Sequence, residues 1–506
     1  MRLDFAEPWR QKQWQVFSPA DSFYASWRVR SGVVPVLRET DESPPPERLL
    51  QAVWQHQRLQ RDQLKTLDGE PVQVLHPGFK NLEAGPDFHG AMIKIGNGPT
   101  LAGDVEVDVR SHGWHAHEHE GNPAYQEVIL HVVWESERPA TARFPTLALR
   151  RVLDAPLAEL NWWLGNEAVQ SLPESLLGKC CAPLRGMALE RLTALLHQAA
   201  QIRLESKAAQ LQACARQAGW EQSLWEGLFR ALGYKQNVWP MQRLGEMRPR
   251  WLSARLAPQT LQARLLGISG LLPAELTRAS ESADCYLRRT WNQWWREWDE
   301  FSDCILPRGL WRFHGLRPAN HPQRRLALAT HWLAAGNLPV KLERWSVAEI
   351  PDVALPDSLL RVLQVERDDF WSWHWTLRSA RLTKPQPLLG TARATDLAMN
   401  VILPWIWIRA VEGGNVTMKR VAERRYFAWP AAEDNARLRL ARQRLLGGAP
   451  RRSLRGAAMQ QGLLQVLRDF CDRSNALCEN CGLPELVQNW NLQSVPDSTA
   501  GCPPSI

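Results

Sequence analysis

Three carboxylates alternate with valine in residues 103–110, a stretch with four ionisable side chains. In an extended chain, residues two apart point to the same face, so Asp104, Glu106 and Asp108 would lie together on one side. Neighbours on such a face are about 7 Å apart, and three anions at that spacing repel one another unless a cation compensates. The pattern predicts either a divalent cation site or a strand whose acidic face is solvated.

Asp87 is the upstream carboxylate that such a site would use. It follows a Gly-Pro pair and precedes a strand-like run at 91–95 and a turn at 96–99. A hairpin with that connection carries Asp87 back toward Glu106 and Asp108. Because Mg²⁺ or Mn²⁺ is typically held by one or two carboxylates with phosphate oxygens and water, the arrangement favours phosphodiester chemistry.

Two cationic side chains lie near these carboxylates in the sequence. Lys94 is in the upstream strand-like run, and Arg110 ends the acidic stretch. Either could offset the negative charge that develops on a phosphate during its hydrolysis. Both are therefore candidates for the catalytic site.

Histidines are concentrated after the acidic stretch. On a strand, His117 and His119 would share one face and could bind a cation together, and His131 lies in an apolar segment at 125–134. Each could act as a general base or a metal ligand, or simply be a hydrogen-bonding surface residue. Since imidazole suits zinc better than magnesium, the cluster keeps zinc as an alternative.

The order of these residues resembles the PD-(D/E)xK nuclease superfamily. Pro86 and Asp87, a hairpin, and then Glu106-x-Asp108 follow the pattern, except that Asp108 stands where the superfamily usually has lysine. The resemblance implies a restriction-endonuclease-like sheet domain, a divalent metal, and DNA or RNA as substrate. The missing lysine puts a mechanism that depends on it in doubt.

The elements that would position these residues belong to an α+β protein. After an irregular segment at 1–47, residues 48–155 predict an α/β nuclease-like domain that includes a helix at about 47–67 and a strand at 71–75. From about residue 156 to 506 the spacing becomes helical, so this larger part is predicted to be mainly α. The predicted helices in this part are 157–164, 189–218, 223–232, 283–301, 323–335 and 453–471.

Composition sets the broad class of the protein. The chain has 506 residues, 44% of them hydrophobic, and a net charge of +8, which permits contact with nucleic acid without requiring it. The 26 tryptophans are expected mostly in cores. The charged N-terminus and the lack of a long uncharged apolar run predict a cytoplasmic protein that does not contact a membrane.

The C-terminal region contains a possible metal knuckle. Cys478 and Cys481 form a Cys-x2-Cys pair, and Cys471 lies upstream. A closed site needs a fourth ligand, for which Cys181 or its neighbour Cys180 is the candidate and Cys502 the alternative. Zinc, an iron–sulfur cluster and unliganded thiols all remain open.

A wider pattern covers nearly the whole chain. The residues that carry it include His76, Pro77, Gly78, Asn81, Gly85, Pro86, Asp87, Glu106, Trp114, His117, His119, Tyr125, His131, Cys471, Cys478, Cys481 and Gly482. Jointly they resemble an uncharacterised bacterial family, domain-of-unknown-function family 2851. The resemblance implies membership but no known activity. Where that family usually has histidine two residues after the strand glutamate, this chain has Asp108.

Three functions follow from these observations. The first is a metal-dependent phosphodiesterase, most simply a nuclease, whose site contains Asp87, Glu106 and Asp108. The second is a non-catalytic nucleic-acid-binding or scaffold protein with a degenerate nuclease-like fold. The third is a zinc-dependent hydrolase of a small substrate, which uses the histidines.

Overall fold

A computed structural model describes most of the chain. The described residues are 22–30, 45–81, 85–110, 122–135, 144–157, 160, 182–234, 236–252, 255–276, 285–447, 454–471 and 481–492. The chain forms two compact units. Unit 1 combines Met1–Glu39, Asn161–Ser206 and Phe427–Ile506, and unit 2 combines Thr40–Leu160 with Lys207–Tyr426. Each unit is thus built from segments that are distant in sequence, whereas the predicted division at 1–47, 48–155 and 156–506 follows the order of secondary structure.

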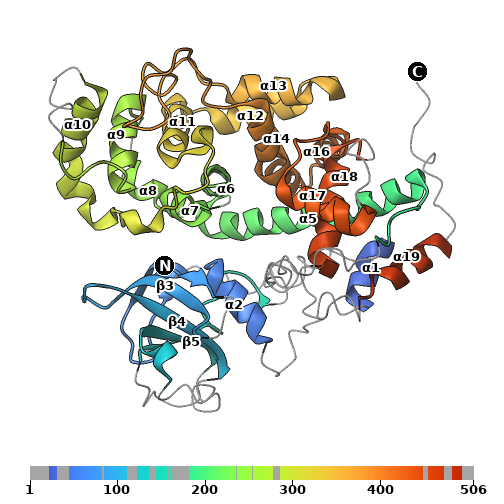
Figure 1. The fold of residues 1–506 in the computed structure, drawn as a ribbon, viewed down its shortest axis with the longest axis horizontal. Helices are drawn as coiled ribbons and strands as arrows, with labels where there is room; N and C mark the ends of the chain where they lie inside the picture. The colour runs from blue at the N-terminus through green and yellow to red at the C-terminus, as the bar shows by residue number, and fades with distance from the viewer. Residues whose placement is uncertain are drawn as a thin grey trace. The chain divides into compact units, whose positions relative to one another are not determined.

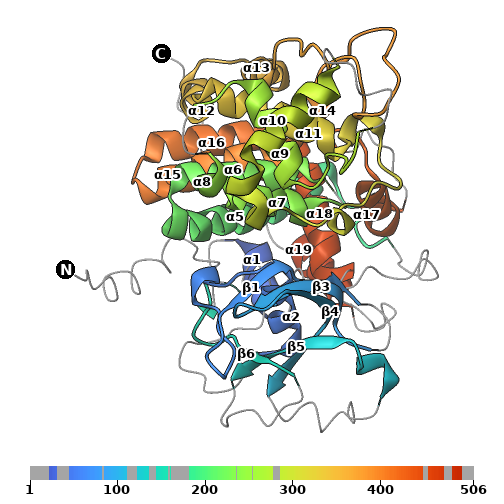
Figure 2. The same ribbon diagram turned by 90° about the vertical axis from the view of Figure 1, so that its left-hand side faces the viewer.

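The structure confirms an α+β fold, with a mixed sheet followed by a larger helical region. The sheet lies in unit 2, and Figure 2 shows its main strands side by side. Its strands are β1 (Val72–His76), β2 (Phe79–Lys80), β3 (Phe88–Ile95), β4 (Thr100–Arg110), β5 (Val128–Glu135) and β6 (Thr146–Ala148). The order is β1-β3-β4-β5-β6, and β2 pairs with β3. Pairs up to β4 are antiparallel, whereas β4 with β5 and β5 with β6 are parallel.

The hairpin of β3 and β4 carries out the predicted reversal of the chain. Lys94 pairs with Thr100 beside the turn, and Phe88 pairs with Val105 at the other end. The turn includes Gly96, whose φ of 56° is the left-handed conformation that glycine adopts without strain. As a result, the residue before β3 lies next to the middle of β4.

Strand β4 is buried on both faces over its central residues. Val105 and Val107 belong to the hydrophobic core, as the alternation predicts. Asp104, Glu106 and Asp108 are only 7%, 7% and 3% exposed, so the reading of a solvated acidic face is wrong for this strand. Burying carboxylates costs free energy unless hydrogen bonds or cations compensate, so their environment needs an explanation.

Helix α2 (Glu47–Gln55) packs against β4 (Figure 1). Its residues from Leu49 to Trp54 are buried, and the Trp54 Nε1–H donates to the Pro77 carbonyl at 2.9 Å. The helix is shorter than the predicted 47–67. It ends because Gln57 has a φ of 49°, which breaks the helical backbone, and the Gln57 side chain donates to the carbonyl of Trp54.

The rest of unit 2 is helical. The predicted helix at 189–218 is confirmed as α5 (Leu189–Ala218), which belongs to unit 2 from Lys207 onward and ends before Gly219 at a φ of 86°. The following helices are α6 (Trp220–Leu232), α7 (Val238–Glu246), α8 (Arg248–Trp251), α9 (Pro258–Ile268), α10 (Tyr286–Phe301), α11 (Pro322–Ala335), α12 (Leu338–Val347), α13 (Leu355–Leu363), α14 (Thr391–Leu397), α15 (Leu403–Glu412) and α16 (Val416–Ala428). Among the described residues, no helix is long and apolar enough to cross a membrane.

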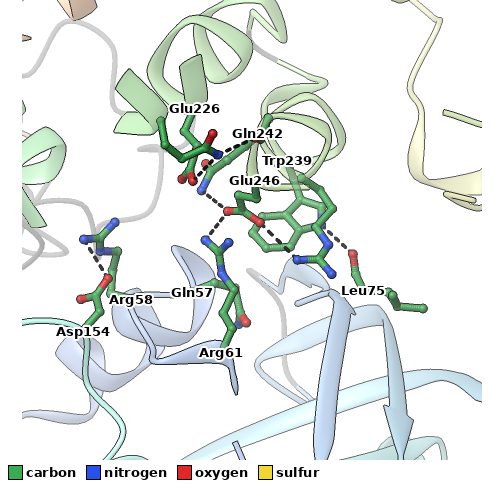
Figure 3. A network of polar contacts seen from close by, with 12 residues as sticks. Gln57, Arg58, Arg61, Leu75, Asp154, Glu226, Trp239, Gln242 and Glu246 are labelled. Carbon is green, nitrogen blue, oxygen red and sulfur yellow. Dashed lines mark hydrogen bonds and ion pairs between the residues drawn. The ribbon is translucent and has the colours of Figure 1, made fainter. Parts of the chain in front are cut away.

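A buried polar network joins the sheet region to helices α6 and α7 within unit 2 (Figure 3). Arg61, after helix α2, forms an ion pair with Glu246 at the end of α7, whose side chain is only 1% exposed. The Trp239 Nε1–H donates to the carbonyl of Leu75 in β1 at 3.0 Å. These contacts fix the helical region against one edge of the sheet.

Unit 1 is held by one core that draws on three parts of the chain. It includes α1 (Phe23–Arg30), the first part of α5, α17 (Ala436–Leu446), α18 (Ala457–Val466) and α19 (Leu483–Leu492). The prediction that residues 1–47 are irregular is therefore wrong for 23–30. Asp469 is buried in this core, accepts from the Tyr24 hydroxyl at 2.7 Å and forms an ion pair with Arg28 at 2.8 Å.

Candidate active site

Asp87 and Glu106 are locked together through the backbone. The Asp87 N–H donates to Glu106 Oε2 at 3.0 Å, and the Val107 N–H donates to Asp87 Oδ2 at 3.1 Å. This reciprocal pair follows from the hairpin register, which sets the start of β3 beside the centre of β4. Hydrogen bonds from backbone N–H groups stabilise the ionised carboxylates and hold their orientation.

Asp108 is paired with a histidine on the neighbouring strand. The His131 Nε2 lies 2.9 Å from Asp108 Oδ2, and both side chains are almost completely buried. In the parallel register of β4 and β5, His131 is the partner of Glu106, so the two lie on the same face of the sheet. The sheet thus brings together three predicted site residues that are separated by up to 25 positions, since 131 − 106 = 25.

Gln51 in helix α2 forms hydrogen bonds with three side chains at the site, although no sequence pattern indicated this residue. The Gln51 side-chain amide donates to Asp87 Oδ1 at 2.7 Å and to Glu47 Oε1 at 3.1 Å. Its carbonyl oxygen accepts from Lys80 Nζ at 3.1 Å. Gln51 therefore orients Asp87 and places a lysine next to it.

Burial and neighbouring carboxylates raise the pKa of Glu106 and of Asp87. Burial raises the pKa of Glu106 to about 9, and the charges of Asp87 and Asp108 add to the effect. Burial and Glu47 raise the pKa of Asp87 to about 7, against the hydrogen bond from Val107. A divalent cation at this position would reverse both shifts, because it stabilises the ionised forms.

Two further ionisable groups respond to the same charge. Burial raises the pKa of Tyr125 to about 12, with contributions from Glu106, Asp87 and Asp108. Burial lowers the pKa of Lys80, although Asp87 opposes that shift. The charges of the acidic cluster thus reach Tyr125, and Lys80 is a cation at the edge of the cluster.

The structure does not bring Lys94 to this cluster. It pairs with Thr100, which lies six residues before Glu106, or roughly 20 Å away along β4. Arg110 ends β4 in an exposed position opposite Glu135. Lys80 instead lies beside Asp87, because β2 pairs with the start of β3 through Lys80 and Phe88.

Asp104 has a separate structural role. Its Oδ2 lies 2.9 Å from His89 Nδ1, and its Oδ1 accepts from the Gly90 N–H at 3.1 Å. These contacts hold the irregular part of β3, where the register with β4 shifts between Phe88 and Ala91. Asp104 therefore stabilises the hairpin that positions Asp87.

His117 and His119 lie outside the described residues, as do Cys181 and Cys478. Cys471 is buried in the core of unit 1, and Cys481 packs against the same core. The two described cysteines of the predicted knuckle thus lie at one core. Both cysteines belong to unit 1, whereas the acidic cluster belongs to unit 2.

The acidic cluster contains side chains that can bind a metal ion, but their oxygens do not converge on one position. Among the described residues, no group of three His, Cys, Asp or Glu side chains is arranged to hold a metal ion. The reason is visible in the hydrogen bonds, since oxygens of Asp87 and Glu106 turn toward backbone N–H groups. The donor set of three carboxylates nevertheless fits Mg²⁺ or Mn²⁺, which prefer oxygen ligands.

Comparison with protein families gives one match. The model of a family described as Protein of unknown function (DUF2851) matches residues 47–435, which include the sheet and most of the helical region. No curated protein and no solved structure matches the chain.

Proposed function

The chain belongs to this family, whose description names no activity, and we propose from the site itself that the protein is a metal-dependent phosphodiesterase acting on nucleic acid. The observation that carries the proposal is the cluster of Asp87, Glu106 and Asp108, in which Glu106 and Asp108 are buried and Asp87 is half-buried. Collecting three carboxylates beneath a helix costs free energy, and a Mg²⁺ or Mn²⁺ ion is the partner that best offsets that cost.

In this proposal, Asp87 and Glu106 bind the divalent cation through their carboxylate oxygens. The ion, when bound, acts as a Lewis acid on the phosphate. Asp108 and His131 share a close polar contact, so this pair can orient a water molecule and accept its proton. Lys80 takes the part first expected of Lys94, because it is the cation beside Asp87.

Gln51 is the positioning residue of the site. It holds one oxygen of Asp87 with its amide and holds Lys80 with its carbonyl oxygen. It therefore fixes the distance between a metal ligand and the cation that would face the phosphate. The resemblance to PD-(D/E)xK nucleases supports nucleic acid as the substrate class, with Lys80 reaching the site from another strand.

Cleavage of labelled DNA and RNA, single- and double-stranded, with Mg²⁺ or Mn²⁺ tests this function. We expect wild-type protein to cleave at least one substrate and Glu106→Gln to lose at least 100-fold in rate. Glu135→Gln is the matched control, because Glu135 is an exposed acid on the adjacent strand. Equal rates for wild type and Glu106→Gln would refute the assignment.

A binding protein without catalysis is the second candidate. The observation that favours it is a basic aromatic surface in the helical region, where the guanidinium groups of Arg367 and Arg381 both lie over Trp373, at 4.4 and 4.3 Å from the ring centroid. Binding of nucleic acid with no cleavage under any metal would favour this function. A zinc-dependent hydrolase of a small substrate would instead need His131 and the histidines at 117 and 119.

The cysteines support a structural proposal. Cys471 and Cys481 lie at the core of unit 1, where Zn²⁺ or an iron–sulfur cluster, completed by Cys478 and Cys181, would tie the C-terminal segment to the unit. Metal analysis of the purified protein tests this directly. We further propose that the protein acts in the cytoplasm, where thiols remain reduced.

A further inference from the structure

The helical region of unit 2 contains a pocket of about 160 Å³. Its floor is apolar and includes Leu271, Leu287 and Leu377, all of them buried. Gln323 shapes one wall, and its amide is held by the Leu271 carbonyl and the Leu377 N–H. A cavity of about 150 Å³ accommodates a benzene-sized ring, so a flat ring system fits this floor.

The rim of the pocket is cationic. Arg308 and Arg378 are both exposed and come from segments 70 residues apart, since 378 − 308 = 70. Within the part of the chain that the structure describes, neither guanidinium group takes part in an ion pair. Guanidinium groups bind phosphate through paired N–H donors, so two at one rim favour a phosphate group.

Two aromatic rings, Phe313 and His321, also line the pocket. Phe313 is 37% exposed and stacks on the His321 ring at a centroid distance of 5.4 Å. His321 Nδ1 is buried and has no hydrogen-bond partner among the described residues. Burial and the neighbouring charge of Arg308 lower the pKa of His321 to about 4, so the ring is neutral at physiological pH. A neutral imidazole offers one hydrogen-bond donor and one acceptor to a ligand.

We propose that this pocket binds one nucleotide of a single-stranded nucleic acid, with its base between the apolar floor and Phe313 and its phosphate between Arg308 and Arg378. His321 gives the base a polar partner. The pocket thus combines a stacking surface with phosphate-binding cations, which is the chemistry that single-strand recognition requires.

The pocket segment also contacts the strand that carries a residue of the candidate active site. Arg312, next to Phe313, lies over the Phe79 ring at 4.3 Å from its centroid, and Asn237 holds the backbone of Arg312. Lys80 follows Phe79 in β2. This assignment rests on the proposed function, because it takes nucleic acid as the substrate. The pocket would then hold a strand while the acidic cluster cleaves it.

Titration calorimetry with 5′-mononucleotides, nucleosides and inorganic phosphate, in the absence of divalent metal, tests the pocket. We expect mononucleotides to bind wild-type protein, and Arg378→Ala and Phe313→Ala each to weaken that binding about tenfold. Arg361→Ala, at an exposed arginine of α13, is the control and should bind as wild type does. Both test residues are exposed, and circular dichroism checks that the variants fold.

Several results would overturn the nucleotide assignment. The first is that mononucleotides do not bind. The second is that inorganic phosphate alone binds as tightly as nucleotides do. The third is that Arg361→Ala weakens mononucleotide binding as much as the test variants do. Because the titration contains no metal and measures no cleavage, its failure is distinct from failure of the nuclease function. Loss of cleavage in Glu106→Gln with intact mononucleotide binding would support both sites independently.

Discussion

The carboxylate of Glu106, which the proposed function requires, lowers the stability of the folded protein when no metal is bound. Its carboxyl is buried beside two others, and its pKa is raised to about 9. The folded protein binds this proton more tightly than the unfolded chain does, in which the pKa is about 4.5. Proton binding therefore contributes its full stabilisation only below pH 4.5. That contribution is lost as the pH rises toward 9. Without metal, the folded protein therefore becomes less stable across this range.

Replacement of Glu106 by glutamine should remove this loss. We expect Glu106→Gln to raise the free energy of unfolding by about 2 kcal/mol at pH 7 in EDTA, and the gain should increase toward pH 9. Thermal unfolding between pH 5 and pH 9 measures it, with Glu135→Gln as the exposed control. An unchanged or reduced stability at every pH would show that Glu106 is not under electrostatic strain.

Metal binding should release the proton that the Glu106 carboxyl holds in the metal-free protein. Because the carboxyl of Glu106 binds a proton below a pKa of about 9, a divalent cation must displace it. We expect the apparent affinity for Mn²⁺ to rise about tenfold per pH unit between pH 7 and 8. Calorimetry in two buffers of different ionisation enthalpy would detect the released proton. A pH-independent affinity without proton release would contradict this prediction.

At the scale of elements, the contact between the sheet region and helix α7 depends on charge. Glu246 is almost completely buried and relies on Arg61, with Arg243 at 3.5 Å as a weaker partner. We expect Arg61→Ala to lower the free energy of unfolding by about 2 kcal/mol, since it leaves a buried carboxylate poorly compensated. Adding Glu246→Gln should restore part of that loss. Chemical denaturation of the single and double variants measures the coupling, and additive effects would refute it.

Much of the element structure was predictable, for local reasons. Alternation identified β4 and helical spacing identified α5, and both predictions are confirmed. Helix α2 was predicted too long because its periodicity continues past Gln57, where the backbone turns to a positive φ. The residues after this turn, 58–60, pair with residues 152–154, and these contacts are not local in sequence.

The candidate site was predictable where it depends on one hairpin. The connection between β3 and β4 was enough to bring Asp87 to Glu106. It did not identify Lys80 or Gln51, since these reach Asp87 through the pairing of β2 and the packing of α2. Lys94 is near these carboxylates in sequence, whereas the register places it at the far end of the hairpin.

At the scale of the whole molecule, the two units should respond separately to substitution. Asp469 is buried in unit 1 and holds Arg28 and Tyr24 from the N-terminal segment. We expect Asp469→Ala to destabilise unit 1 by about 3 kcal/mol, because it leaves a buried arginine without its carboxylate. Unit 2 should retain its stability. Hydrogen exchange measured along the chain distinguishes the units.

The control for this substitution is Glu485→Gln, at an exposed acid on α19 of the same unit. It should leave exchange unchanged in both units. Faster exchange across unit 2 in Asp469→Ala would mean that the units unfold together, contrary to the prediction. Nucleic-acid cleavage by Asp469→Ala should stay within about twofold of wild type, since the acidic cluster lies in unit 2.

Unit 1 combines the first and last segments of the chain, and this affects how it folds during protein synthesis. Helix α1 is made early, but Asp469, its buried partner, is translated more than four hundred residues later. Every segment of unit 2 is translated before Asp469, so that unit can fold on the ribosome first. Helix α1 must therefore wait for the last part of the chain, and during this interval its apolar side chains are open to chaperones.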